Sequence, residues 1–249
     1  MDINKDQTLK VCKIAWKAGR KILDIYSKNF KIFKKKDLSP VTIADLESEK
    51  IIIKGLKKIF SKPKIFSEES NYKNKKKLKD FWLVDPLDGT KEFIKKNGEF
   101  TVNIAFVKDR RPVFGIIYAP VLKKTYVGIK KSTYKIINEI NFKKIVPKKK
   151  NSKTIIISRS HSTKGEGEKL KKKYNVKKIL FLGSSLKFCY IAEGLANIYP
   201  RSGTTYEWDT AAGHAIINGI GGKIETKNGS ELKYGKKDFK NTNFIAKAS

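Results

Sequence analysis

The sequence is poor in the residues that bind soft metals and form disulfides. Of its 249 residues, two are cysteine, Cys12 and Cys189, and two are histidine. Two cysteines without paired spacing exclude a disulfide framework and a zinc knuckle, and they are typical of a reducing compartment. A metal site would therefore be built from oxygen ligands, which favours a hard cation such as Mg²⁺ over zinc.

Long apolar runs are also absent. No stretch approaches the roughly 20 consecutive apolar residues that cross a membrane. Residues 1–6 are polar and lack the apolar core of a signal peptide. We therefore expect a soluble, cytoplasmic protein.

Negative charge is scarce, with 24 acidic residues against 56 basic ones and a net charge of +32. This excess suggests either a protein that binds nucleic acid or membrane surfaces, or a lysine-biased composition. Arginine occurs only at positions 20, 110, 111, 159 and 201. A surface that grips phosphates should use more of it, because its planar fork matches phosphate oxygens. We favour biased composition and expect no specific nucleic-acid partner, although the charge would steer an anionic substrate and permit peripheral membrane association.

The chain is long and apolar enough, at 39% hydrophobic residues, to bury a sizeable core. In the first half, periodicity predicts helices over 5–29 and 43–60, a basic loop over 31–39 and a polar loop over 71–80. Strands are predicted there over 64–67, 81–84, 100–107, 113–118, 124–129, 133–137 and 142–146. After a linker at 147–151, strands are expected over 154–158, 178–182, 196–200, 222–225 and 243–246, with helices over 163–173, 184–194 and 209–218. The pattern is an α+β half followed by an α/β half.

The most informative segment is Asp85-Pro86-Leu87-Asp88-Gly89-Thr90, directly after the apolar run 81–84. Two carboxylates flank a turn that proline stiffens, and glycine allows close approach of the backbone to a ligand. Such an arrangement suits a metal site, although Asp-x-x-Asp-Gly alone is also common in ordinary turns.

Other acidic residues stand at the ends of apolar segments: Glu68 and Glu69 after 65–67, Asp209 after Trp208, and Asp45 near a helix start. Each has a plain alternative, since the glutamates could be a solvated pair and the aspartates helix caps. Taken with the hexapeptide they favour a cation site. Carboxylates gathered in one place repel one another unless a cation neutralises them.

Two segments together, Asp85–Thr90 and Trp208–Gly213, resemble the two-part signature of the inositol monophosphatase superfamily, and 67–70 fits its third piece. Members are Mg²⁺-dependent, lithium-sensitive phosphomonoesterases. The resemblance implies an α/β (α+β) fold, the layered α/β/α/β/α sandwich of the inositol monophosphatase and fructose-1,6-bisphosphatase type. It also implies one domain over 1–249, with halves of about 1–147 and 152–249 and the active site between them.

A closer resemblance is to the bacterial CysQ branch of that superfamily, carried by segments 39–42, 82–84, 91–94, 97–105, 158–161, 183–189 and 192–194. These are 3′(2′),5′-bisphosphate nucleotidases, which convert adenosine 3′,5′-bisphosphate to AMP and phosphate and so support sulfur assimilation. The resemblance to this branch is also compatible with peripheral association of the protein with the cytoplasmic face of the inner membrane. An inositol- or sugar-phosphate phosphatase on the same scaffold is the alternative. Residues 204–207 depart from the usual run, and Glu207 adds a charge expected near the site.

The resemblance assigns roles to individual residues. Two or three Mg²⁺ ions are implied, one held by Glu68, Asp85 and the Leu87 carbonyl, and a second by Asp85, Asp88 and Asp209. Thr90, Asp45 and Glu68 would act on the attacking water. The substrate phosphate would contact Glu68, Leu87, Asp88, Gly89, Thr90 and Asp209, while His161, Ser184, Lys187 and Arg201 would bind the rest of the nucleotide. His214 and Cys189 are expected to be structural, and the oligomeric state stays open.

Overall fold

The structure, a computed structural model, describes residues 2–35, 39–70, 78–146, 153–163 and 165–248. The first half contains α1 (Lys5–Tyr26), β1 (Ile32–Lys34), β2 (Pro40–Thr42), α2 (Ile43–Ile59), β3 (Ile65–Ser67), β4 (Asp80–Asp88), α3 (Thr90–Ile94), β5 (Thr101–Lys108), β6 (Arg111–Ala119), β7 (Lys124–Ile129), β8 (Ser132–Ile137) and β9 (Asn141–Lys144). The second half contains β10 (Thr154–Ser158), α4 (Glu166–Tyr174), β11 (Lys178–Leu182), α5 (Leu186–Ala192), β12 (Ile198–Arg201), α6 (Glu207–Gly219), β13 (Lys223–Thr226) and β14 (Phe244–Lys247).

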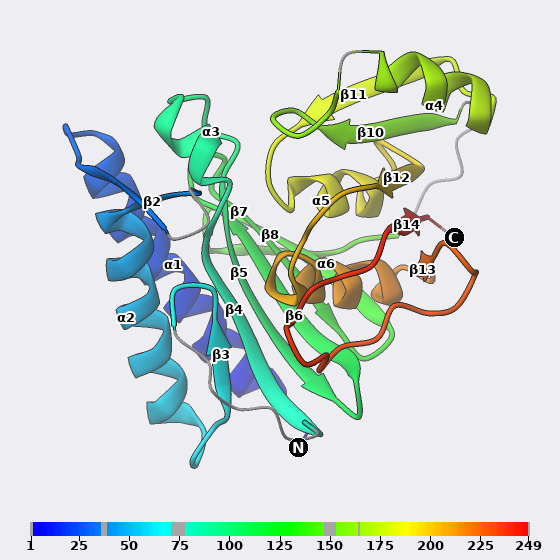
Figure 1. Cartoon of the computed structure of the whole chain (residues 1–249). Coiled ribbons are helices and arrows are strands. Elements are labelled where there is room, and N and C mark those ends of the chain that lie inside the picture. Colours follow the sequence, from blue (N-terminus) through cyan, green and yellow to red (C-terminus); the bar gives the residue numbers. More distant parts are fainter. Residues whose placement is uncertain (1, 36–38, 71–77, 147–152, 164, 249) are drawn as a thin grey trace.

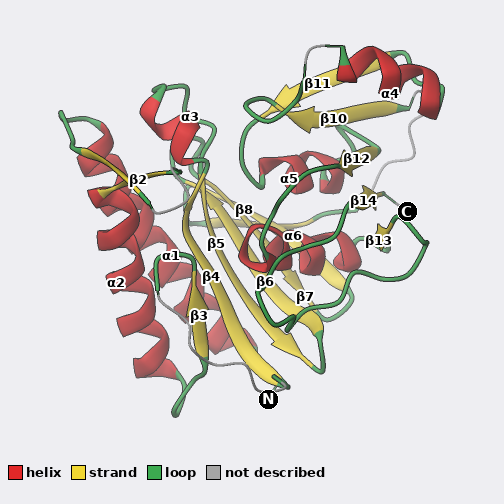
Figure 2. Ribbon diagram, in the orientation of Figure 1, coloured by secondary structure: helices red, strands yellow, loops and turns green. Residues whose placement is uncertain are grey.

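Helices and sheets alternate in layers (Figure 1). A seven-stranded sheet, in the order β3-β4-β5-β6-β7-β8-β9, has α1 and α2 on one face and α6 with α5 on the other. Beyond α5 and α6 lies a five-stranded sheet, in the order β11-β10-β12-β14-β13, with α4 on its outer side (Figure 2). The layered α/β/α/β/α sandwich predicted from the sequence is confirmed.

The seven-stranded sheet is covered on both faces, and its central strands show how. In β5, Val102, Ile104 and Phe106 join the core beneath α1 and α2. The alternate residues Ala105 and Val107 join the core beneath α5 and α6. Successive side chains of a strand point to opposite faces, so a strand buried on both faces appears in the sequence as a continuous apolar run.

Two glycines bring α6 close to the sheet. Gly115 of β6 and Gly128 of β7 are paired across the strands. A Cβ atom at Gly115 would lie 2.5 Å from the Ala212 carbonyl oxygen, and one at Gly128 would lie 2.4 Å from the backbone of Ala215. The helix therefore rests its backbone on the sheet, and this contact fixes the depth at which α6 presents its first turn.

Several predictions of local structure need correction. The predicted helix 5–29 ends at Tyr26, and the predicted helix 163–173 begins at Glu166. The basic loop 31–39 contains β1, which pairs antiparallel with β2. The predicted strand 81–84 continues to Asp88, because the ladder with β5 absorbs the proline in a bulge instead of ending. The predicted helix 209–218 begins at Glu207, two residues earlier. The expected linker at 147–151, and the expected loop at 71–80 up to residue 77, lie outside the described residues.

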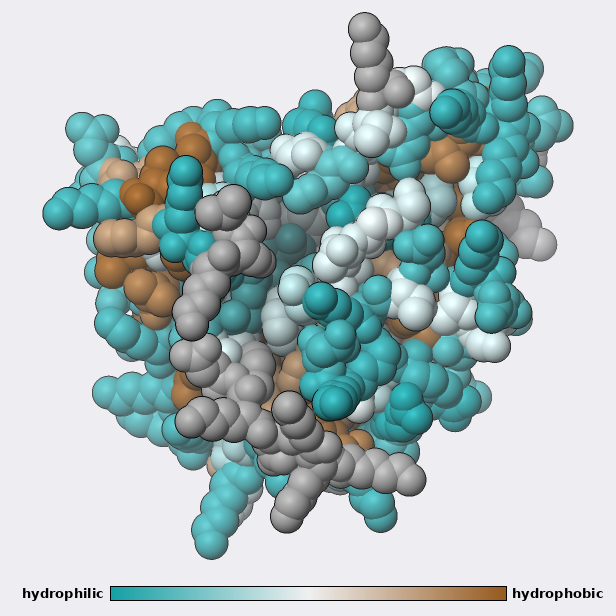
Figure 3. Space-filling model, in the orientation of Figure 1, coloured by the Kyte–Doolittle hydropathy of each residue, from teal (hydrophilic) through white to brown (hydrophobic). Residues whose placement is uncertain are grey.

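Hydrophilic side chains cover most of the face seen in Figure 3, in keeping with the excess of lysine. Among the helices of the described residues, none combines the length and the apolar character needed to cross a membrane.

The glycine pair under α6 gives a direct test of the packing. Gly128→Ala should destabilise the protein by about 3 kcal/mol, because overpacking a tight contact costs roughly that much. Gly167→Ala on α4 is the control: its Cβ would meet side-chain tips and no backbone, the nearest being that of Ile179 at 3.1 Å, and alanine favours helix. Chemical denaturation measures both. Equal stability of the two variants would contradict the proposed packing.

Candidate active site

The hexapeptide forms the end of β4 and carries a β-bulge. Asp85 pairs with Asn103 and Asp88 with Thr101, so one extra residue lies on the β4 side. The bulge follows from Pro86, which has no N–H to donate to the ladder. Its carbonyl accepts a hydrogen bond from Ser48 Oγ of α2 at 2.7 Å, which fixes the bulged segment to the helix layer. The sequence predicted a turn at the end of the strand, whereas Asp85 and Asp88 lie on β4 itself, which the Ser48 hydrogen bond ties to α2.

Two helices begin with the same motif, and each places an aspartate in the site. In α2, Asp45 Oδ2 accepts hydrogen bonds from the N–H of Thr42, at 2.8 Å, and from its hydroxyl. In α6, Asp209 Oδ2 accepts the Tyr206 N–H at 2.8 Å. A carboxylate at the third helical position that accepts the N–H of the residue before the helix makes the return contact of a capping box. Both aspartates therefore help to cap a helix, although the N-cap residues themselves are Thr42 and Tyr206. The contact uses one oxygen of each carboxylate and leaves the second for other partners.

Glu68, Asp85 and Asp209 form a carboxylate cluster, with one ligand oxygen of each within 4.8 Å of the others. Burial raises the pKa of Asp85 well above its usual value, and repulsion by Glu68, Asp88 and Asp209 adds to this. Burial, then Asp88 and Glu68, raise the pKa of Asp209 in the same way. Burial also raises the pKa of Asp88 to about 6, although Lys187 opposes it. A cation bound among these carboxylates would relieve their repulsion and favour their ionised form, so the cluster is suited to binding one.

Lys35 is a neighbour of the cluster that the sequence did not indicate. Its Nζ lies 2.7 Å from Glu68 Oε1 and 2.6 Å from Glu69 Oε1. Burial lowers the pKa of Lys35, but the two glutamates outweigh burial and the net direction is upward. Burial and Glu68 together raise the pKa of Glu69 to about 7, despite Lys35.

A cleft of about 390 Å³ opens over the cluster. Thr90 stands at its edge, where its hydroxyl donates to Asp45 Oδ1 at 3.1 Å and approaches the Leu87 carbonyl at 3.3 Å. Burial raises the pKa of Asp45. Of the predicted site residues, all except Asp45 line this cleft: Glu68, Asp85, Leu87, Asp88, Gly89, Thr90, His161, Ser184, Lys187, Arg201 and Asp209.

Two cationic side chains, Lys187 and Arg201, also line the cleft. Arg201 donates through Nη2 to the Thr204 carbonyl at 3.2 Å, while its buried Nε has no hydrogen-bond partner. Lys187 is 4% exposed, and its ammonium donates to the carbonyls of Leu182 and Ser184. Burial lowers the pKa of Lys187 to about 8, with Asp88 opposing and Arg201 adding to the effect. Burial also lowers the pKa of His161 to about 4, helped by the positive charges of Lys91 and Arg201.

Sequence reasoning missed the residues that shape the loop between β11 and α5. Glu99 accepts the Gly183 N–H at 2.7 Å and forms two hydrogen bonds with Arg159. The Ser185 N–H donates to Asp88 Oδ2 at 2.6 Å, so this loop also holds a carboxylate of the site. Glu99 lay within the segment that resembles the nucleotidase branch, but nothing in its spacing identified its partners.

Glu207 lies at the start of α6, two residues before Asp209, but it is not among the described residues that line the cleft. Its buried carboxylate faces the C-terminal segment instead. His214 is buried inside α6, 3.1 Å from the Tyr234 hydroxyl, and Cys189 is buried in α5. Both occupy the kind of packed position that was predicted.

The model of the inositol monophosphatase family matches residues 4–249. The chain belongs to the inositol monophosphatase family. A 3′(2′),5′-bisphosphate nucleotidase CysQ from Buchnera aphidicola (subsp. Acyrthosiphon pisum, strain APS) is 43% identical over 249 residues, covering 96% of this chain and 92% of the relative. The protein of the same name from Escherichia coli (strain K12) is 39% identical over 229 residues, covering 90% of this chain and 92% of the relative.

Solved structures of the inositol monophosphatase family share the fold. CysQ from Bacteroides thetaiotaomicron, described as a bacterial member of the family, superposes with a TM-score of 0.85 at 38% identity. The match covers 98% of this chain and 97% of the other. The similarity therefore extends over both halves and includes every segment that contributes to the cleft.

The buried carboxylates make stability depend on pH in a defined direction. Asp88 has a folded pKa of about 6 against an ordinary value of 3.8. Its favourable contribution is thus fully present below pH 4 and is lost as the pH rises through 6. Both histidines oppose this trend, because burial lowers the pKa of each to about 4, and their contribution is lost as the pH falls below 6.5. A comparison with Asp88→Asn cancels the histidine contribution.

We expect metal-free Asp88→Asn to match wild type near pH 4 and to melt at a higher temperature at pH 7. The difference should be about 3 °C or more, since 1 kcal/mol shifts the midpoint by roughly 2–4 °C at this size. Mg²⁺ should raise the wild-type midpoint more at pH 7 than at pH 5, and raise that of the variant less. Thermal melts with chelator and with Mg²⁺ measure this. A wild-type advantage at pH 7 without metal would contradict the charge repulsion described above.

Proposed function

We propose that the protein is a Mg²⁺-dependent phosphomonoesterase that hydrolyses the 3′-phosphate of adenosine 3′,5′-bisphosphate, giving AMP and phosphate. The observation that carries this proposal is that one cleft is lined both by a carboxylate cluster and by Arg201, whose buried Nε has no hydrogen-bond partner. A substrate with two phosphates could place one at the cluster and the other at Arg201. The names of the similar proteins, 3′(2′),5′-bisphosphate nucleotidases, support the same substrate.

The residues fit a hard divalent cation. Glu68, Asp85 and Asp209 offer only oxygen ligands, which Mg²⁺ prefers. The raised pKa values of Asp85 and Asp209 reflect burial and a repulsion that a cation would relieve. The Leu87 carbonyl and Asp88 would complete the ligands for two or three ions. Such ions, when bound, activate water and neutralise charge on the transferred phosphate.

The protein's own contribution to the chemistry centres on Thr90 and Asp45. The Thr90 hydroxyl donates to Asp45 Oδ1, so its lone pairs are free to accept a proton from an attacking water. Asp45 can receive that proton in turn, because burial raises its pKa. Such a pair orients the water and moves its proton away from the phosphate. Glu68, at the edge of the cluster, would help to hold the water.

The remaining cleft residues would bind the nucleotide. Arg201 is the partner for the 5′-phosphate, because a guanidinium forms strong charge-assisted hydrogen bonds with phosphate oxygens. His161, Ser184 and Lys187 would line the nucleoside, and the N–H groups of Gly89 and Thr90 would approach the reacting phosphate. We also infer that both halves act as one domain, since Glu68 and Asp85 come from the first half and Asp209 from the second.

A substrate panel tests the proposed activity. With Mg²⁺, phosphate release from adenosine 3′,5′-bisphosphate should be at least tenfold more efficient, as kcat/KM, than release from inositol 1-phosphate. Asp209→Asn should abolish release from both, because it removes a cluster carboxylate while the amide can still cap α6. Faster hydrolysis of inositol 1-phosphate would instead favour the alternative phosphatase.

The role of Arg201 can be isolated by choice of substrate. Arg201→Ala should raise KM for adenosine 3′,5′-bisphosphate by about 10- to 100-fold, the usual cost of losing a hydrogen bond to a charged group. KM for adenosine 3′-monophosphate, which lacks the 5′-phosphate, should stay unchanged. Arg20→Ala, which removes an exposed ion pair with Glu139, is the control. An equal rise in KM for both nucleotides would argue against Arg201 as the 5′-phosphate partner.

A further inference from the structure

Tyr206 holds the carboxylate of Asp209 by a hydrogen bond, and Asn241, which lies outside α6, holds Tyr206. The Tyr206 N–H donates to Asp209 Oδ2 at 2.8 Å. The Tyr206 carbonyl accepts a hydrogen bond from Asn241 Nδ2 at 2.7 Å. The same amide nitrogen lies 3.0 Å from Thr210 Oγ1, on the other side of Asp209. Asn241 thus contacts the residues that flank Asp209 without touching Asp209 itself.

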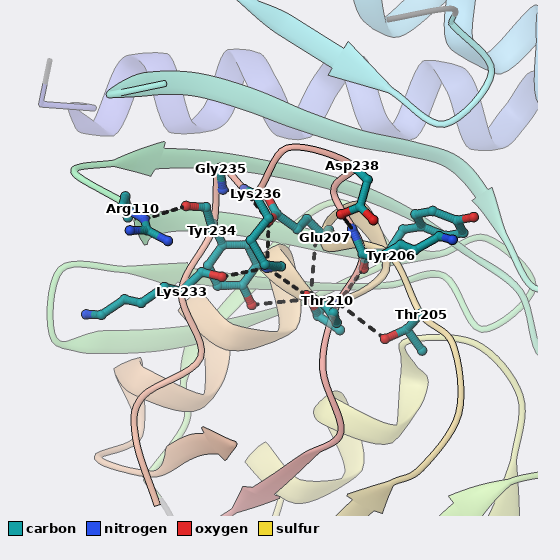
Figure 4. A network of polar contacts seen from close by, with 12 residues as sticks. Arg110, Thr205, Tyr206, Glu207, Thr210, Lys233, Tyr234, Gly235, Lys236 and Asp238 are labelled. Carbon is teal, nitrogen blue, oxygen red and sulfur yellow. Dashed lines mark hydrogen bonds and ion pairs between the residues drawn. The ribbon is translucent and has the colours of Figure 1, made fainter. Parts of the chain in front are cut away.

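Asn241 belongs to a segment that crosses the start of α6, which we call the C-terminal strap (residues 233–241). Glu207 anchors the strap: its buried carboxylate accepts the N–H groups of Gly235, at 2.7 Å, and Lys236, at 2.9 Å. Lys236 Nζ lies 2.6 Å from the same carboxylate. Figure 4 shows Glu207 and Thr210 facing Tyr234 and Lys236 across this contact. A buried carboxylate with this many partners holds two segments together firmly.

The strap also reaches β3, the strand that leads to Glu68. The Phe239 ring lies 4.9 Å from the ring of Phe66 and 5.7 Å from that of Trp208, measured between centroids. Phe66 precedes Glu68 by two residues, and Trp208 directly precedes Asp209. One segment therefore packs against the carriers of two cluster carboxylates that lie far apart in the sequence.

This arrangement counteracts the repulsion among the carboxylates of the cluster. Three carboxylates within 4.8 Å repel one another, and an aspartate side chain can turn about χ1 to relieve the repulsion. A hydrogen bond from a fixed N–H prevents that rotation, but only while the N–H itself stays in place. The Asn241 side chain fixes Tyr206 from its carbonyl side, in addition to the backbone hydrogen bond from the Asn241 N–H to the Thr205 carbonyl at 2.9 Å.

We propose that Asn241 is a positioning residue, which holds Tyr206 so that the carboxylate of Asp209 stays ready to bind a divalent cation. The inference rests on the proposed function for the choice of Mg²⁺ as the ion. Groups that orient a metal ligand through a hydrogen bond typically change metal affinity by about 10- to 100-fold when removed.

The test measures Mg²⁺ dependence in two ways on the full chain. The first is the Mg²⁺ concentration that gives half of the maximal rise in thermal midpoint, and the second is the concentration that gives half-maximal hydrolysis of adenosine 3′,5′-bisphosphate. Asn241→Ala should raise both by about tenfold. At saturating Mg²⁺, KM for the nucleotide should change by less than about threefold, since Asn241 lies outside the cleft-lining residues.

Asn197→Ala is the matched control. Asn197 is also partly buried and accepts the Thr154 N–H at 2.9 Å, so its side chain holds the start of β10 instead of the start of α6. It should lower the midpoint without moving either Mg²⁺ concentration. If Asn241→Ala behaves like Asn197→Ala, the positioning role is wrong and Asn241 is merely structural. If wild type fails to hydrolyse the nucleotide but the Mg²⁺ midpoint still responds as expected, the proposed function fails and the positioning role stands.

A second variant covers the case in which Asn241→Ala does not fold. Lys236→Met keeps the apolar stem but removes the ammonium, which donates to Asn241 Oδ1 at 3.3 Å and pairs with Glu207. A rise of about threefold or more in the Mg²⁺ concentration for half of the thermal shift supports the proposal. An unchanged Mg²⁺ concentration overturns it.

Discussion

Repulsion among buried carboxylates is the constraint on which the rest of this structure depends. Glu68, Asp85 and Asp209 lie within reach of one ion, and Asp88 adds its charge beside them. Nothing in the chemistry of these side chains keeps them together, so the surrounding fold must do it. An anchored bulge carries Asp85, the end of β3 leads to Glu68, and the first turn of α6 carries Asp209. The layered sandwich brings three unrelated segments to one point and keeps them there.

The strong positive charge of the protein does not extend evenly into the site. The chain has 56 basic residues, yet its cleft is lined by a carboxylate cluster as well as by Lys187 and Arg201. Charge counted over the whole chain governs long-range attraction of an anion, whereas the local arrangement governs which phosphate goes where. The scarce arginine is informative for the same reason: one of five is placed in the cleft with a donor to spare.

The sequence predicted the elements well because burial patterns are local. Helix α2 and strands β7 and β10 were anticipated to within a residue, and the order of layers followed from the resemblance. The bulge at Asp85–Asp88 was not predicted, because it depends on how β5 pairs with a strand that contains proline. Nor were the partners Lys35, Glu99 and Asn241, since each meets its partner only through long-range folding. The sequence indicated which acidic residues form the site, but it did not indicate the hydrogen bonds and ion pairs that hold them in place.

At the starts of α2 and α6, one aspartate side chain has two roles. In Asp45 and Asp209 one oxygen begins a helix while the other faces the site. Asp85 and Asp88 also accept hydrogen bonds, from the Leu87 N–H and from Asn103 and Ser185, but neither of them begins a helix. Burial raises the pKa of both, so their ionisation works against folding. A descendant of this protein that abandoned catalysis would therefore be expected to shed Asp85 and Asp88 early, gaining stability, but to retain Asp45 and Asp209. Surviving aspartates at helix starts are thus a poor sign of activity in distant relatives, and the pair on the strand is the one to look for.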